Sequence, residues 1–256
     1  MTEATRALTR RPCLRVAEGE VTHLARVSVD PATAFAQHAA YLTLLSKHGL
    51  ALISLPELPD HPDGLFVEDI VVMLDGTAVL TLPGAVSRRG EVASAEATLS
   101  TLGLPIARIT APATLDGGDV LILERHVLVG RSTRTNDAAL EQLARLVTGS
   151  ARTVLGIDVH RALHLKTAVT RLPDGSLIAV PDFVDVAQLE ALGYRVHSAL
   201  EESGGDVLCL EQTVVLPSDA PRTAAALQGL GFTIELLDIS ELQKLEAGLT
   251  CMSVLL

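Results

Sequence analysis

Two arginines occupy matching positions from which their side chains could bind a carboxylate. Arg88 and Arg134 each follow, by four residues, a glycine that ends a short apolar run, Gly84 and Gly130 respectively. A pair of guanidinium groups can clamp one carboxylate, because each planar group donates parallel hydrogen bonds. The alternative is that each arginine pairs with local acidic residues at the surface.

A second candidate group is a set of aspartates in a recurring pattern. The segment Gly-Gly-Asp-Val-Leu occurs at 117–121 and again at 204–208. An aspartate after two glycines can cap backbone N–H groups where a strand begins. Structural roles are therefore expected for Asp119 and Asp206, which recur at equivalent positions.

Two acidic residues break this pattern, and a polar residue in one copy needs another explanation. Asp116 precedes the first glycine pair, where the later copy has Ser203. Glycines allow close backbone approach, so Asp116 is the better site candidate. Asp69 stands at the recurring aspartate position and is expected to be structural, whereas Glu68 stands where the other copies have glycine.

Nucleophilic and titratable residues carry little information when taken singly. His164 lies in the apolar segment Leu-His-Leu-Lys-Thr and is expected at the start of a strand. A histidine there is more often a buried core residue, and Cys251, before the apolar run Met-Ser-Val-Leu-Leu, is of a type that is often buried and inert. The three cysteines and the histidine spacing indicate neither a disulfide framework nor a metal site.

The elements that must position these residues recur along the chain. Short apolar runs separated by turn residues alternate with stretches whose Leu and Ala residues have helical spacing. We count five strand–strand–helix–strand units with a period of about 40–45 residues. Their expected bounds are 21–55, 66–109, 117–158, 163–197 and 204–239.

Such units are too small to bury their own apolar faces and must pack against one another. The expected fold is therefore α/β, a five-bladed α/β propeller around a central channel, in a single domain spanning 1–256. In the first and weakest unit we expect a strand within 21–29, a helix around 32–48 and a strand within 50–55. The alternative is an open α/β sheet in which the repeats are coincidental.

Composition excludes several classes of protein. Hydrophobic residues make up 48% and charged residues 20%, which is incompatible with global disorder. A net charge of −11 and 2% aromatic residues argue against nucleic-acid binding. With no apolar run long enough for a membrane span, no signal peptide and few cysteines, we expect a cytoplasmic protein with no membrane contact.

Six motifs of this chain together resemble the dimethylarginine dimethylaminohydrolase (dimethylargininase) family, guanidino-modifying enzymes with the five-bladed pentein fold. The resemblance covers essentially the whole chain. The motifs occur in the family's order at Phe66–Asp69, Pro83–Arg89, Thr114–Val120, Arg134–Asn136, His164–Thr167 and Leu249–Leu255.

The resemblance implies a role for each matching residue. Cys251, in the segment 240–256, would be the nucleophile, His164 the general acid/base and Asp116 the acidic member of the triad. The residues implied in substrate binding are Asp69 and Asp116 for the guanidinium, Arg88 and Arg134 for the α-carboxylate, Asp63 for the α-ammonium group, and Glu68, the backbone around Leu245, and Leu24 in a lid at 19–24 for the rest of the pocket.

The implied activity is hydrolysis of Nω-methylated L-arginine to L-citrulline and methylamine or dimethylamine, through a covalent thiouronium intermediate, without a metal or organic cofactor. Arginine or agmatine deimination and amidino transfer are alternatives on the same fold; the arginine pair argues against agmatine, which lacks a carboxylate. A non-catalytic binding module and inhibition by zinc at Cys251 and His164 are further alternatives. A monomer or homodimer is expected.

Overall fold

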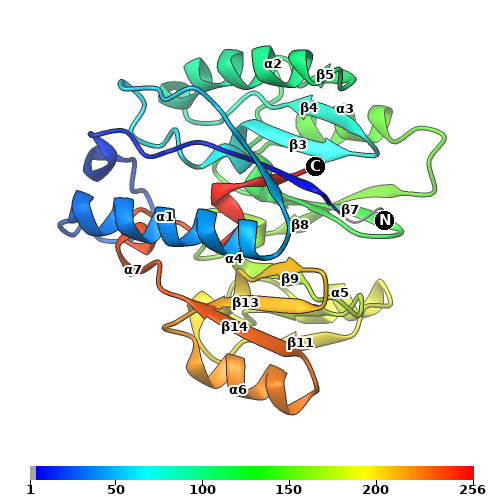
Figure 1. Cartoon of the computed structure of the whole chain (residues 1–256). Helices are drawn as coiled ribbons and strands as arrows, with labels where there is room; N and C mark the ends of the chain where they lie inside the picture. The colour runs from blue at the N-terminus through cyan, green and yellow to red at the C-terminus, as the bar shows by residue number, and fades with distance from the viewer. Residues whose placement is uncertain (1–3) are drawn as a thin grey trace.

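The computed structural model describes residues 4–256, which form five three-stranded sheets arranged as a ring of units (Figure 1). In every sheet the middle strand pairs antiparallel with one neighbour and parallel with the other. The repeats inferred from the sequence therefore correspond to repeated supersecondary units, and the α/β five-bladed architecture is confirmed.

Four of the sheets follow the expected units. Their strands, in chain order, are β3 (Val71–Leu74), β4 (Thr77–Leu80), β5 (Ile106–Arg108); β6 (Val120–Ile122), β7 (His126–Arg131), β8 (Thr153–Asp158); β9 (Val169–Arg171), β10 (Leu177–Ala179), β11 (Val196–Ser198); β12 (Leu208–Leu210), β13 (Thr213–Pro217), β14 (Thr233–Leu237).

The first sheet differs from the expectation. It joins β1 (Arg6–Thr9) and β2 (Ala51–Ser54) to the last strand, β15 (Val254–Leu255), so the two ends of the chain close the ring. The strand expected within 21–29 is wrong: these residues form neither helix nor strand. The physical reason is that residues 22–28 have no buried side: all of them are exposed, with Leu24 at 55% and Val27 at 51%.

Five of the seven helices that the structure describes connect the middle strand of a sheet to its parallel strand, and they lie outside the sheets. Figure 1 shows α2 at the top and α6 at the bottom of the ring. Aspartate or asparagine caps start several of them, as where Asp30 accepts the N–H of Ala32 and Asn136 that of Ala139. The helices are α1 (Pro31–Lys47), α2 (Val92–Thr101), α3 (Asp137–Leu146), α4 (Leu165–Ala168), α5 (Val186–Ala191), α6 (Pro221–Gly229) and α7 (Ser240–Gln243).

The apolar core lies between neighbouring units. Separate clusters of buried Leu, Val, Ile and Ala residues join the closing sheet to the second unit, the second to the third, the third to the fourth and fifth, and the fifth back to the first. Each unit thus buries its faces against two others, as the repeat argument requires.

A ring of short turns lies just before the first strand of each unit and defines the centre of the molecule. Four are 3-10 turns, and the fifth is the one-turn helix α4. The 3-10 turns are η2 (Val67–Ile70), η4 (Gly117–Asp119), η5 (Glu202–Gly205) and η6 (Thr250–Met252). Turn η2 contacts η4 and η6, and α4 contacts η4 and η5. Residues from distant parts of the chain therefore meet there.

None of the helices within 4–256 has both the length and the apolar character needed to cross a bilayer.

Candidate active site

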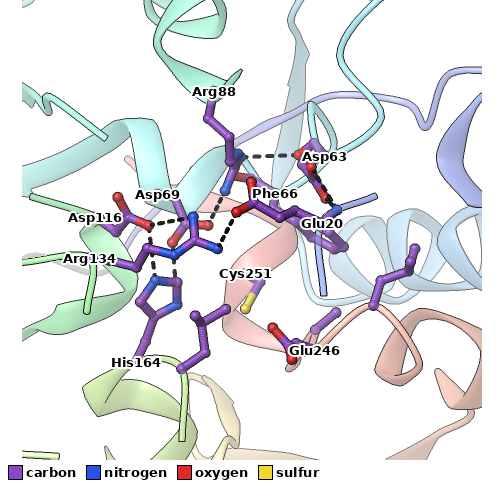
Figure 2. A pocket seen from close by; sticks show the side chains of 13 residues that line it. Glu20, Asp63, Phe66, Asp69, Arg88, Asp116, Arg134, His164, Glu246 and Cys251 are labelled. Carbon is purple, nitrogen blue, oxygen red and sulfur yellow. Dashed lines mark hydrogen bonds and ion pairs between the residues drawn. The ribbon is translucent and has the colours of Figure 1, made fainter. Parts of the chain in front are cut away.

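One pocket at the centre of the ring brings together eight of the ten residues that the sequence singles out (Figure 2). They are Cys251, His164, Asp116, Asp69, Arg88, Arg134, Asp63 and Leu245. The pocket is also lined by Glu20, Phe66, Leu163, Glu246 and Ala247, which the sequence did not indicate as contacts.

His164 is the N-cap of α4 rather than the start of a strand, because the chain makes one helical turn before β9 begins. Its Nε2 lies 3.1 Å from Asp116 Oδ2, and its Nδ1 lies 3.8 Å from Asp69 Oδ1. Burial opposes the charged ring, but Asp69, Asp116 and Asp119 outweigh it and raise the pKa of His164 to about 9. The imidazole therefore carries a proton at neutral pH.

Asp116 is completely buried and held by hydrogen bonds on several sides. Its Oδ1 accepts the backbone N–H of Gly84 at 2.9 Å, and its own N–H donates to Thr135 Oγ1 at 3.1 Å. A side chain at Gly84 would collide with the backbone of Arg134. The Pro-Gly turn therefore allows this close packing, which fixes the carboxylate against His164.

The glycine pair beside Asp116 is explained by the same crowding. A side chain at Gly117 would collide with the backbone of Glu68, and one at Gly118 would collide with the ring of His164 and the carboxylate of Asp69. The acidic residue and the histidine can approach each other only because the turn between them has no side chains.

Cys251 lies on η6 and its sulfur faces the pocket (Figure 2). The Sγ accepts the N–H of Gly248 at 3.3 Å. Burial, followed by the charges of Asp206, Glu68 and Asp69, raises the pKa of the thiol well above its usual value. The cysteine is thus a neutral thiol in this structure, and a positive charge in the pocket would favour the thiolate.

Arg88 is buried in a network of protein acceptors. It forms an ion pair with Asp69 and bonds to both oxygens of Glu91, at 3.0 and 2.8 Å. Its Nη2 also donates to the carbonyl oxygens of Asp63 and Phe66. Arg88 lines the pocket, but it pairs with acidic residues of the protein, as the alternative in the sequence analysis allowed. These ion pairs are buried and not at the surface.

The guanidinium group of Arg134 is bound by fewer protein acceptors than that of Arg88. Its Nη2 lies 3.3 Å from Glu20 Oε1, and its Nη1 lies 4.0 Å from Asp116 Oδ2. Figure 2 shows the Glu20 carboxylate reaching toward the guanidinium from the opposite wall. Glu20 also accepts a hydrogen bond from Ser87 at 3.0 Å. A carboxylate from the protein itself therefore occupies one face of Arg134.

The expected lid at 19–24 lies against the pocket mouth. The N–H of Glu20 donates to both oxygens of Asp63 at 3.1 Å. Glu246 Oε1 accepts the backbone N–H groups of Thr22, His23 and Leu24. The lid is therefore tied from two sides by carboxylates.

Two of the expected substrate contacts do not line the pocket. The Leu24 side chain is exposed and is not among the pocket-lining residues, while its backbone N–H donates to Glu246. Glu68 is buried outside the pocket lining, where it forms an ion pair with Lys166 and accepts a hydrogen bond from Thr250 Oγ1 at 2.8 Å. The partners of its carboxylate come from other units of the ring. Residue type and motif position do not predict these partners.

Asp69, Asp116 and His164 bring potential metal-ligand atoms within 4.8 Å of one another. In this structure Arg88 pairs with Asp69, and a protonated imidazole lies between the two carboxylates. These cationic groups already neutralise the two carboxylates, which leaves the cluster little negative charge to attract a divalent metal ion.

Comparison with known proteins agrees with this geometry. The family model for arginine deiminase matches residues 99–195. An N(G),N(G)-dimethylarginine dimethylaminohydrolase from Streptomyces coelicolor is 42% identical over 97% of this chain and 96% of its own. The chain belongs to the dimethylarginine dimethylaminohydrolase family.

Other members of this family support the assignment. The Pseudomonas aeruginosa enzyme is 30% identical over 96% of this chain and 97% of its own. A structure of a mutant of that enzyme, complexed with citrulline, superimposes with a TM-score of 0.92 at 29% identity and covers 99% of this chain and 100% of that chain. The dimethylarginine dimethylaminohydrolase family thus accounts for both the fold and the ring of central turns.

Proposed function

We propose that this protein hydrolyses Nω-methylated L-arginine to L-citrulline and methylamine or dimethylamine. The observation that carries the proposal is that Cys251, His164 and Asp116, from three different units, face one pocket in a chain of this family. We further propose that residues 1–256 form one catalytic domain, active as a monomer or homodimer, since one chain contributes all three residues.

The amino-acid end of the substrate is proposed to lie toward the lid. Arg134 would bind the α-carboxylate in place of Glu20, with the charge of Arg88 in the same wall. Asp63 would accept the α-ammonium group, and the loop at Leu245 would cover the aliphatic stem. Asp63 is buried, which raises the pKa of its carboxyl, and the neighbouring Arg88 opposes this shift.

The guanidinium end is proposed to lie between Asp69 and Asp116, facing Cys251. Paired charge-assisted hydrogen bonds would fix the planar cation and hold its carbon next to the sulfur. Because the thiol is neutral in the free protein, the positive charge of the bound substrate would supply the field that favours the attacking thiolate.

The reaction then takes two stages. When substrate binds, the thiol of Cys251 loses its proton to solvent, because His164 already carries one. The thiolate adds to the guanidinium carbon, and His164 donates its proton to the departing amine, so that the C–N bond breaks and a thiouronium remains on Cys251. The neutral His164 next accepts a proton from water, whose oxygen adds to the same carbon. The C–S bond then breaks, the hydroxyl proton of the adduct passes to the sulfur, and citrulline and the thiol are released. This chemistry requires no metal or organic cofactor.

Product analysis tests the proposal. Wild-type protein incubated with monomethylarginine or dimethylarginine should release citrulline and the matching amine in equal amounts. Replacing Cys251 with Ser should abolish citrulline release while substrate still binds, measured by calorimetry. Turnover of the variant close to that of the wild type would contradict the nucleophile assignment.

Hydrolysis of unmethylated arginine is the second candidate, favoured by the match of the arginine deiminase model to 99–195. The same assay separates the two, because arginine would yield ammonia and citrulline. Three free cysteines are consistent with action in the cytoplasm, the compartment that we propose.

A further inference from the structure

Three aspartates at the recurring position of their units share one contact. Each accepts, through Oδ1, a backbone N–H from the next turn around the central ring. The pairs, with their oxygen-to-nitrogen distances, are Asp69 with Gly118 at 3.1 Å, Asp119 with Leu165 at 2.9 Å and Asp206 with Thr250 at 3.0 Å. The repeated contact links successive turns in the ring.

The turns that donate these N–H groups lie next to the residues that take part in the proposed reaction. Gly118 belongs to the turn that follows Asp116, Leu165 directly follows His164, and Thr250 directly precedes Cys251. A hydrogen bond from the peptide N–H to a carboxylate restricts the backbone from which the reacting side chain projects. One repeated structural contact therefore lies next to each member of the proposed triad.

Asp119 is held rigidly on its own side. Its Oδ2 accepts a hydrogen bond from Ser132 at 2.6 Å, and Gly130 leaves room for the carboxylate, which a side chain there would displace. Asp119 is completely buried and does not line the pocket. It therefore acts on the reaction through its neighbours, which are Leu165 directly after His164 and Ser132, whose Oγ accepts the N–H of Arg134 at 3.0 Å.

Asp206 supports the turn of the nucleophile at more than one point. Besides the N–H of Thr250, it lies 3.4 Å from Thr250 Oγ1, which also donates to Glu68. Lys166 neutralises Glu68, and Gly248 packs directly on the Asp206 carboxylate, where a side chain would collide. Three units thus converge on the residue before Cys251.

We propose that Asp119 and Asp206 are positioning residues, Asp119 orienting His164 and Asp206 orienting Cys251 through Thr250. The proposal rests on the proposed function for the identity of the reaction, but the two orientations can be measured without turnover. Neither residue touches the pocket, so substrate affinity should change little when either is replaced.

Different sets of charged side chains surround His164 and Cys251. His164 is faced by Asp69, Asp116 and Asp119, and Cys251 by Asp206, Glu68 and Asp69. An Asp→Asn change keeps an acceptor oxygen for the N–H and removes one negative charge, whereas Asp→Ala removes both. The two substitutions therefore separate orientation from charge.

The experiment compares D119A, D119N, D206A and D206N with a matched control, D174A and D174N. Asp174 also accepts a backbone N–H and a serine hydroxyl, from Ser176, but in the hairpin turn between β9 and β10. Turnover, KM and thermal stability are measured for each protein. We expect the Ala variants at 119 and 206 to lose kcat by about ten- to a hundredfold with KM within about twofold.

The Asn variants are expected to recover most of this kcat, whereas the Asp174 variants keep wild-type kcat. The proposal is overturned if D119A and D206A retain wild-type kcat, or if D174A loses as much as they do. It is also overturned if Asn recovers nothing relative to Ala at both positions.

Two titrations do not depend on turnover or on the Ala variants folding. Alkylation of Cys251 by iodoacetamide, followed across pH on the tryptic peptide 245–256, should show a midpoint lower by about one pH unit in D206N. NMR titration of the His164 ring, identified by its absence in H164Q, should show a lower midpoint in D119N.

Unchanged midpoints in both variants overturn the proposal. If the wild-type protein makes no citrulline from any methylated arginine, the proposed function fails, while these two titrations still decide the placement of Asp119 and Asp206.

Discussion

Replacing Asp206 with Asn should make the protein more stable at alkaline pH, even though the residue is proposed to serve the active site. Burial, and then the charge of Glu68, raises the pKa of Asp206 from 3.8 to about 7. The folded state therefore binds this proton more tightly than the unfolded state does. The resulting stabilisation is present at low pH and is lost as pH rises from about 4 through about 7.

The size of the effect follows from this difference. A shift of about three pKa units corresponds to roughly 4 kcal/mol, which is an upper value for the cost of the charged carboxylate above pH 7. Asn can still accept the N–H of Thr250 and is uncharged at every pH. The gap between D206N and the wild type should therefore widen as the pH rises from about 4, to roughly 1.5 kcal/mol at pH 5 and up to about 4 kcal/mol at pH 8.

Urea denaturation of both proteins at pH 5, 6.5 and 8 measures this prediction, with D174N as the control. Asp174 has its pKa lowered, by hydrogen bonds with Ser176 that outweigh burial, so D174N should not gain stability as the pH rises. A difference between D206N and wild type that stays constant across this range would refute the reasoning. So would a D206N protein that is less stable than the wild type at pH 8.

Three further predictions concern the pocket and its lid. Replacing Arg134 with Gln should raise KM for methylated arginine by about 10- to 100-fold, which is the contribution of hydrogen bonds to a charged group. KM for the decarboxylated analogue should stay nearly unchanged. An equal increase of KM for both compounds would contradict a carboxylate contact. Replacing Glu246 with Ala should free the backbone at 22–24, raising KM about fivefold and speeding proteolysis of the lid, with Gln giving a smaller effect; a lid cleaved at the wild-type rate would contradict this role. Because the pKa of His164 is about 9, its proton is available below that pH, so kcat should fall as pH rises through 9, and a kcat that keeps rising beyond pH 10 would contradict its role as proton donor.

Much of the fold follows from local patterns that the sequence displays directly. The stretches of helical Leu and Ala spacing within the units 117–158 and 204–239 form α3 and α6, and the turn Pro173–Gly175 connects β9 to β10. Such elements are visible because periodicity, caps and turn residues are local properties. Repetition then supplied the architecture, since five similar units leave few ways of burying their faces.

The closing sheet could not be derived in this way. Its middle strand, β1, and its last strand, β15, come from opposite ends of the chain and pair only in the folded protein. The segment 21–29 has an alternating pattern suited to a strand, yet it forms neither helix nor strand and leads into α1. Alternation states which residues could share a face, and only tertiary packing decides whether that face is buried.

Glu68 and Glu20 show the same limit within the site. Motif position predicts Glu68 in the pocket, but its carboxylate is bound by Lys166 and Thr250 and does not line the pocket. Glu20 was not singled out, although its carboxylate lies on Arg134. The direction in which a long acidic side chain points depends on which partners the fold brings near, and those partners lie far away in the sequence.

Asp69 shows that a structural and a functional role are not alternatives in this fold. Its recurring position indicated a structural residue, and it does hold the turn of Gly118, while its other oxygen pairs with Arg88 and its carboxylate lines the pocket. In a ring of similar units, the contact that joins one turn to the next lies at the centre by construction. A residue that builds the ring therefore already stands within reach of whatever binds there, and burial of its charge is tolerated because the neighbouring turn supplies the hydrogen bond.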